Sequence, residues 1–379
     1  YEWDTWAILD KDCAEANNAV MPTSASGTNE SHAAFNANGT GPFKIVSHEP
    51  GVKTVFQKNE DWWGEVQHNL DEVIFTPISS DATRVAALLS GEIDFMDPVP
   101  VQDIDRVNNN EGTSVLVGPE LRTIFLGFDQ KRDELLYSSV KGKNPFQDQR
   151  VRQAFFQAID IETIKDKVMR GLSAPSALMI SPFLFSRSGE FERLPYDPEA
   201  SKALLAEAGY PDGFEVGMDC PNDRYVNDEA ICQAVAAMLA KVGVTVNLNA
   251  QPKAKYFAKV LASGGYDTSF YLLGWTPGSF DSYNVLLNLH GCRDETGAGG
   301  PFNLGGYCNE KVDELAAQIL VETDPAKRDE LIAEAMTMTL DDVSHIPLHQ
   351  QALAWGKRDN VDIVQRADNQ VMLYRINKN

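Results

Sequence analysis

Residues 214–249, FEVGMDCPNDRYVNDEAICQAVAAMLAKVGVTVNLN, decide the fold class of this chain. Phe214–Met218 and Thr245–Asn249 are short, strand-like segments at the two ends of the stretch. Between them, Asp228–Val242 carries apolar residues at helical spacing. A strand, a helix and a second strand in this order predict two parallel strands joined by a helical crossover.

The same alternation continues on both sides of this unit, through residues 150–343. Further helices are expected at Gln149–Arg170, Pro198–Ala208, Tyr256–Ser263, Asn309–Glu322 and Pro325–Asp341, and a further strand at Thr268–Gly274, while Leu121–Phe128 before them is a strongly apolar run. Strands that alternate with helices predict an α/β domain built on a mostly parallel sheet.

The chain before residue 121 has a different character, with many strands and few helices. We expect strands at Phe43–Val46, Val52–Lys58, Val73–Thr76 and Ile93–Met96, a helix at Ala82–Ser90 capped by Asp81, and short strands again over Ile346–Ile376. Because Ile346–Ile376 resembles the part before residue 121, we expect both to belong to one lobe, with the residues between them forming a second lobe.

This pattern predicts two lobes joined by a hinge of two strands, with a ligand cleft between them. The expected division is 1–125 for what is present of lobe I, 126–345 for the α/β lobe II, and 346–379 for the return to lobe I.

The net charge and the hydropathy of the chain limit which kinds of molecule it can bind and whether it can span a membrane. The 379 residues include 55 acidic and 33 basic side chains, for a net charge of −22. Such a surface repels phosphate backbones and anionic lipid, so we expect no nucleic-acid partner. No run of 18 apolar residues is present to span a bilayer. The opening residues Tyr1–Asp4 show no signal peptide and therefore say nothing about secretion.

The five cysteines suggest one local disulfide. Cys292 and Cys308 flank a Gly-rich stretch, and a covalent link would restrain so loose a loop. Two reduced thiols are the alternative. Cys220 and Cys232 either pair or are simply buried, and Cys13 has no obvious local partner.

Catalytic and cofactor motifs are missing from the sequence. It contains no phosphate-binding loop, no dinucleotide-binding glycine pattern, no nucleophile elbow and no Cys-x-x-Cys pair. His345 and His349 are four residues apart, but Pro347 between them breaks the helix that a zinc pair would need. We therefore expect no enzyme, no cofactor and no metal. A hydrolase that uses the cleft is the less favoured alternative.

Two segments that follow strands are candidates for ligand recognition, because ligands bind at the carboxyl ends of strands in α/β sheets. In the first, Arg224 suits a carboxylate, unless it is an ordinary surface arginine. The second leaves its strand at Trp275 and combines aromatic rings, hydroxyls and free backbone, unless it is a packed Trp corner. The candidate ligand residues are Asn222, Arg224, Tyr225, Trp275, Thr276, Pro277, Gly278, Ser279, Asp281 and Tyr283.

Several ordered motifs are similar to those of one known family. They are Gly39–Phe43 with Asn59–Trp63, Asp81–Arg84 through Gly91–Asp94, Pro145–Ala154 with Ala158–Asp160, Ala203–Tyr210, Gly274-Trp275 and Asp324–Arg328. From about residue 39 onward the chain resembles the family-5 extracellular solute-binding proteins, which are the dipeptide, oligopeptide and nickel receptors of ABC importers.

The resemblance implies a type II periplasmic-binding-protein fold that closes over its ligand, with the N-terminal part of lobe I missing from this sequence. It implies capture of a peptide or peptide-like solute for import, a membrane-embedded ABC permease as partner, and a periplasmic location. We expect a monomer. A receptor that presents its closed form to a signalling sensor is a further alternative.

The resemblance also assigns roles to the candidate residues. Arg224 stands where peptide-binding members hold the ligand carboxylate, and the Trp275 loop stands where the ligand backbone pairs like an added strand. Gly278 occupies a position where an aspartate usually holds the ligand ammonium. Either Asp281 replaces that aspartate or the ligand lacks a free amine. In the second case an opine, a sugar conjugate or another anionic solute is expected.

Overall fold

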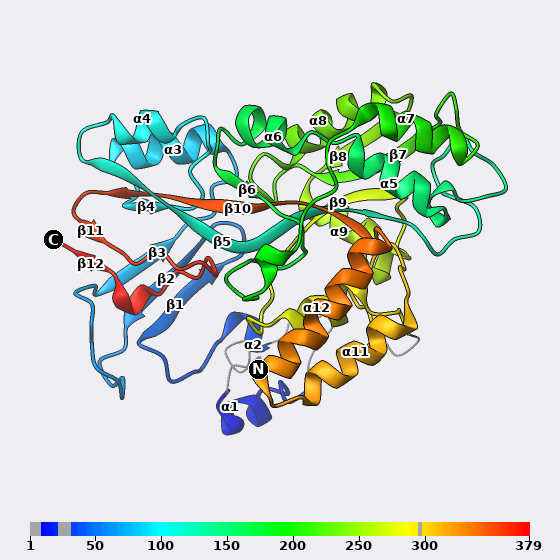
Figure 1. The fold of residues 1–379 in the computed structure, drawn as a ribbon. Coiled ribbons are helices and arrows are strands. Elements are labelled where there is room, and N and C mark those ends of the chain that lie inside the picture. Colours follow the sequence, from blue (N-terminus) through cyan, green and yellow to red (C-terminus); the bar gives the residue numbers. More distant parts are fainter. Residues whose placement is uncertain (1–8, 22–31, 295–297) are drawn as a thin grey trace. The chain divides into compact units, whose positions relative to one another are not determined.

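The computed structural model describes residues 9–21, 32–294 and 298–379, so the chain start Tyr1–Asp4 and Gly297 of the Gly-rich stretch lie outside the described residues. The described chain forms two compact units. Unit 1 comprises residues 100–102 and 118–353, and unit 2 comprises the described residues up to 99 with 103–117 and 354–379. Two long strands, β5 (Thr113–Phe128) and β10 (His345–Arg358), each run from one unit into the other (Figure 1).

Unit 1 is built on a sheet with the strand order β10-β5-β9-β7-β8, and β6 (Ser173–Pro175) pairs with β10. Strand β7 (Glu215–Pro221) runs parallel to both β8 (Thr245–Gln251) and β9 (Phe270–Trp275). The strand–helix–strand unit predicted for 214–249 is therefore confirmed, and so is the α/β class.

The expectation of a mostly parallel sheet is wrong for the other half of unit 1. Strand β5 runs antiparallel to β9, with Ile124 opposite Gly274, and β6 runs antiparallel to β10. The sheet is mixed because strand direction depends on which strands become neighbours. Strands β5 and β9 are far apart in the sequence, and local periodicity carries no information about their pairing.

Helices cover both faces of this sheet (Figure 1). Alternate side chains of β5 point to opposite faces: Ile124 and Leu126 pack with the helices α5, α7 and α8, whereas Phe125 packs with α9, α11 and α12. The helix bounds are α5 Gln149–Gln157, α7 Pro198–Glu207, α8 Asp228–Ala240, α9 Lys253–Val260, α11 Glu310–Val321 and α12 Pro325–Asp341. Sequence reasoning located each of these helices.

The single helix predicted for Gln149–Arg170 is wrong, because the chain breaks into shorter pieces after α5. The Asp160 side chain accepts a hydrogen bond from the Thr163 amide and starts α6 (Ile161–Thr163), which continues as the π-helical turn η3 (Ile164–Val168). An aspartate side chain that caps a new helix replaces the backbone bonds that would continue the old one.

Unit 2 contains an antiparallel sheet with the order β1-β2-β3, whose hairpin β1–β2 is the one predicted. Helix α3 is capped by Ser80, whose hydroxyl accepts from the Thr83 amide, and not by Asp81 as predicted. The bounds in this unit are α1 Lys11–Ala16, α2 His32–Phe35, β1 Phe43–Glu49, β2 Lys53–Lys58, β3 Glu72–Phe75, α3 Asp81–Ser90, β4 Phe95–Met96, α4 Ile104–Asn108, β11 Val361–Asp362 and β12 Asn377–Lys378.

The prediction of short strands over Ile346–Ile376 is also wrong, because most of the first half of that range is the single 14-residue strand β10. The polar residues Gln350 and Gln351 lie within this strand, and the side-chain amide of each donates to a partner inside the protein. Within the described residues, no helix has the length and apolar character needed to cross a membrane.

Candidate ligand-binding site

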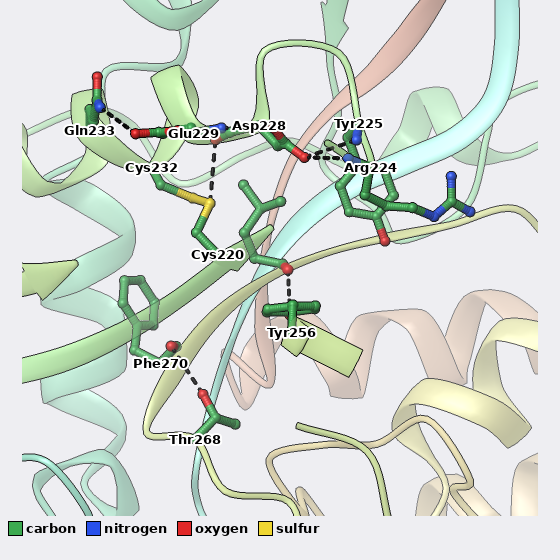
Figure 2. The surroundings of a disulfide bond; sticks show 11 residues. Cys220, Arg224, Tyr225, Asp228, Glu229, Cys232, Gln233, Tyr256, Thr268 and Phe270 are labelled. Atoms are coloured by element: carbon green, nitrogen blue, oxygen red, sulfur yellow. Dashed lines mark hydrogen bonds between the residues drawn. A yellow bond between two sulfur atoms is a disulfide. The ribbon is translucent and has the colours of Figure 1, made fainter. Parts of the chain in front are cut away.

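The first candidate segment begins where β7 ends, at a disulfide between Cys220 and Cys232 (Figure 2). This bridge, which sequence reasoning left open, joins the end of β7 to helix α8 and is completely buried. Asp228, at the start of α8, is only 3% exposed and accepts hydrogen bonds from the backbone amides of Arg224 (2.9 Å) and Tyr225 (3.0 Å). The strand end, the helix and the buried carboxylate together hold the loop 221–227 in one conformation.

The two candidate segments are in contact through Tyr225 and Gly274. The Tyr225 hydroxyl donates to the Gly274 carbonyl oxygen over 3.3 Å. The Tyr225 ring also lies directly over Gly274, because a Cβ atom added there would be 2.7 Å from the ring. A glycine at the end of β9 is thus what permits the two loops to meet.

The side chain of Arg224 extends from this contact between the two loops into solvent. Its guanidinium carbon lies 5.1 Å from the centre of the Tyr225 ring. Figure 2 shows the side chain extending away from the disulfide. Among the described residues the guanidinium has no hydrogen-bond acceptor and no carboxylate partner, and the residue is exposed. An arginine held by its backbone, with free donors, can bind an incoming carboxylate.

A second arginine, which sequence reasoning missed, lies at the same ring. The guanidinium carbon of Arg122 is 5.6 Å from the centre of the Tyr225 ring, and its Nε donates to Glu120 Oε1 over 3.0 Å. The other carboxylate oxygen of Glu120 accepts from Gln351 over 2.7 Å. Burial raises the pKa of Glu120, while Arg122, Gln351 and Arg224 act in the opposite direction. The sequence did contain a signal for Arg122: Glu120 and Arg122 carry opposite charges two residues apart, next to the apolar run Leu121–Phe128.

Trp275 is held in place at one edge of its ring. Its indole Nε1 donates to Asn284 Oδ1 over 2.8 Å, and its ring lies 4.8 Å from that of Phe302. The residue is half-buried. The alternative that Trp275 is a packed side chain is therefore partly correct, because these two contacts fix the position of its ring.

The loop after Trp275 presents unused backbone donors. The amides of Thr276, Gly278 and Ser279 donate to no residue in the described part of the chain. The hydroxyls of Thr276 and Ser279 are buried and have no partner there either. Pro277 is buried and has no amide hydrogen to offer. Free amides at the end of a strand can pair with the backbone of an extended ligand.

The remaining candidate residues have structural tasks. The Asp281 carboxylate caps α10 (Ser282–Val285) by accepting from the Tyr283 amide over 2.7 Å, and it pairs with Arg328 over 2.8 Å. Tyr283 itself is half-buried against the core around α11 and α12. Asn222 is exposed, and its amide donates to the Gln251 carbonyl.

The predicted disulfide between Cys292 and Cys308 is confirmed, with its Cα atoms 4.5 Å apart. Cys13 carries a free thiol. A separate cavity of about 500 Å³ lies on unit 1 beside β7 and β8, where Asp219 pairs with Lys259 over 2.7 Å. None of the candidate ligand residues lines that cavity.

Comparison with known proteins identifies one family. The family model described as bacterial extracellular solute-binding proteins, family 5, matches residues 11–297. The glutathione-binding protein GsiB of Salmonella typhimurium is 24% identical over 331 residues, which cover 86% of this chain and 61% of that protein. The chain thus spans about three fifths of the length of this relative.

Solved structures share the fold. The dipeptide-binding protein of Pseudoalteromonas sp. SM9913, in complex with Met-Leu, superposes with a TM-score of 0.81 at 23% identity, covering 98% of this chain and 69% of that one. The periplasmic-type binding protein AgaA of A. tumefaciens, in complex with agropinic acid, gives a TM-score of 0.73 at 23% identity, covering 90% and 67%. The resemblance inferred from the motifs is confirmed at the level of family and fold.

Proposed function

Because the chain belongs to the family-5 bacterial extracellular solute-binding proteins, we propose that it is the solute-binding component of an ABC importer. It captures a peptide or peptide-like solute in the periplasm and delivers it to a membrane-embedded permease. It acts as a monomer, and it releases the solute chemically unchanged.

The observation that carries this proposal is the contact between Tyr225 and Gly274, beside an arginine with free donors. It supports a recognition surface made of the loop after β7 and the loop after β9. Arg224 anchors a solute carboxylate, Trp275 forms an aromatic wall, and the amides of the loop 276–279 pair with the solute backbone. Asn222, Asp281 and Tyr283 complete the surface as polar contacts.

A second candidate ligand is an anionic solute without a free amine, such as an opine or a sugar conjugate. It is favoured by Gly278, which offers no carboxylate for an ammonium group, and by Asp281, whose carboxylate is already paired with Arg328. The agropinic acid complex of AgaA shows that a protein of this fold can hold such a ligand.

Capture by closure of two lobes also belongs to the proposal. Strands β5 and β10 are the long segments of chain that pass from one unit to the other, and they are the expected hinge. Solute binding would shift an equilibrium from an open to a closed arrangement.

A solute screen tests the proposed function. Purified chain is heated with dipeptides, glutathione, opines and sugar conjugates one at a time, because a bound solute raises the melting temperature by an amount that grows with the logarithm of its concentration relative to its Kd. We expect stabilisation by at least one carboxylate-bearing solute, confirmed by calorimetric titration, and recovery of that solute at unchanged mass. No stabilisation by any class would contradict solute binding. Recovery of a cleaved solute would instead support the hydrolase alternative.

A further inference from the structure

Arg122 is singled out neither by the motifs nor by the comparisons. Its side chain is only 13% exposed, yet only its Nε has a hydrogen-bond partner, the carboxylate of Glu120. The two terminal nitrogens of the guanidinium donate to no residue in the described chain. An arginine offers five N–H donors, and a mostly buried guanidinium is normally fully paired. The two terminal nitrogens are not among the fully buried atoms that lack a partner, so they remain accessible to an incoming ligand.

Three elements fix the orientation of Arg122. Glu120 and Arg122 lie on β5, Gln351 lies on β10, and the Gln351 Oε1 accepts from the Val226 amide of the loop 221–227 over 3.1 Å. Gln351 also donates to Glu120 over 2.7 Å. This chain of hydrogen bonds, within unit 1, holds the Glu120 carboxylate, and the carboxylate holds Arg122 by its Nε alone. The terminal nitrogens are left directed elsewhere.

Arg122 and Arg224 share one aromatic platform, the ring of Tyr225, with guanidinium carbons 5.6 Å and 5.1 Å from its centre. Both carboxylate oxygens of Glu120 accept hydrogen bonds, as those of an ionised carboxylate do. The cluster of Arg122, Arg224 and Glu120 then carries one net positive charge. A solute with two carboxylates and one ammonium group carries one net negative charge and matches it.

The geometry points to Arg122 as a second carboxylate-binding residue that, together with Arg224, selects peptide-like solutes bearing two carboxylates. This inference rests on the proposed solute-binding function and adds the class of solute. Arg224 takes one carboxylate and Arg122 takes the other with its terminal nitrogens. A solute with a single carboxylate leaves the terminal nitrogens of Arg122 without an acceptor, because Glu120 contacts only its Nε, and donors that a bound solute covers without pairing weaken its binding.

The dipeptides Ala-Glu and Ala-Gln test the inference, because they differ only in the second carboxylate. Calorimetric titration of the 379-residue chain is expected to show binding of Ala-Glu at least about tenfold tighter than of Ala-Gln. Arg122→Gln should reduce this preference to about twofold or less while binding of Ala-Gln changes little. Arg122→Lys should keep part of the preference, since lysine supplies a charge without the fork geometry.

Two further variants separate recognition from folding. Arg187→Gln removes a half-buried arginine that pairs with Glu190 in the same unit, and it should leave the preference intact. If Arg122→Gln unfolds the chain because Glu120 is left buried and unpaired, the double variant Glu120→Gln/Arg122→Gln removes both charges. The double variant should show the same loss of preference for Ala-Glu.

The outcomes distinguish this inference from the proposed function. Equal binding of both dipeptides by the unmodified chain would overturn the role of Arg122 and leave solute binding intact. A preference that survives in Arg122→Gln or in the double variant would overturn it as well. Binding of neither dipeptide would overturn the peptide function, and the inference with it.

Discussion

The Tyr225 hydroxyl donates a hydrogen bond to the Gly274 carbonyl oxygen over 3.3 Å, and its ring covers the same glycine. Tyr225 follows β7, and Gly274 belongs to β9. This contact joins the loops at the carboxyl ends of two neighbouring parallel strands, which is where solutes bind in α/β sheets.

Replacement of Gly274 by alanine should damage the junction. The added Cβ would lie 2.7 Å from the Tyr225 ring and 2.8 Å from Ile124 Cδ1, so one of them must move. We expect a loss of about 1–3 kcal/mol in the free energy of unfolding, as for other overpacked sites, and weaker solute binding. Chemical denaturation and calorimetric titration measure the two effects.

Gly189→Ala is the matched control for this change, because nothing lies within 4 Å of a Cβ atom added at Gly189. It should alter neither stability nor binding. Equal behaviour of Gly274→Ala and Gly189→Ala would show that the contact between Tyr225 and Gly274 is dispensable.

Removal of the Arg224 guanidinium should affect binding but not folding. The side chain is exposed and unpaired within the described residues, so Arg224→Ala should change the free energy of unfolding by less than about 0.5 kcal/mol. Binding of a carboxylate-bearing solute should weaken by about 1.5–3 kcal/mol, the range for a charge-assisted hydrogen bond. Titration of the solute identified in the screen measures it, and an unchanged affinity would exclude Arg224 from the site.

The disulfide between Cys220 and Cys232 should contribute strongly to stability. It closes a loop with a sequence separation of 12, for which the chain-entropy model gives about 3 kcal/mol. The double variant Cys220→Ala/Cys232→Ala should lower the free energy of unfolding by about that amount. Cys13→Ala, which removes the free thiol, is the control and should have little effect. Equal unfolding midpoints for the two variants would contradict a role for the bridge.

Acid should destabilise the protein through its buried histidines. Burial lowers the pKa of His290 to about 4, and burial together with Arg193 lowers that of His349 to about 3. Burial also lowers the pKa of His345 well below its ordinary value. The folded state therefore binds fewer protons than the unfolded state below about pH 6.5, the ordinary histidine pKa.

The free energy of unfolding should consequently be highest above pH 6.5 and fall as the pH decreases toward 4, by up to about 1.4 kcal/mol per pH unit for each such histidine. His349→Gln removes one titrating group, and the decrease should become shallower. Denaturation curves measured between pH 7 and pH 4 test this. An identical slope in His349→Gln would show that His349 is protonated in the folded state.

Sequence reasoning succeeded where structure is encoded locally. The strand–helix–strand unit of residues 214–249 follows from its own periodicity, and the Cys292–Cys308 disulfide follows from the loop that it closes. The two candidate loops could be located because they follow strands that the pattern identifies. Their contact could also be anticipated, since the carboxyl ends of parallel neighbours lie at one edge of a sheet.

The failures arise where distant segments decide the structure. The antiparallel pairing of β5 with β9 and the long course of β10 depend on partners that no local pattern reveals. Arg122 was missed for the same reason: its significance comes from Gln351, more than two hundred residues away, which holds Glu120 in place.

Hydrogen exchange tests the central claim most directly, because it reports which backbone amides a bound solute protects. The chain is compared with and without the solute that stabilises it most in the screen, and exchange is followed by mass spectrometry. The account predicts slower exchange in both loops, 221–227 and 275–283, upon binding. A solute that binds tightly but leaves exchange in both loops unchanged would contradict the account.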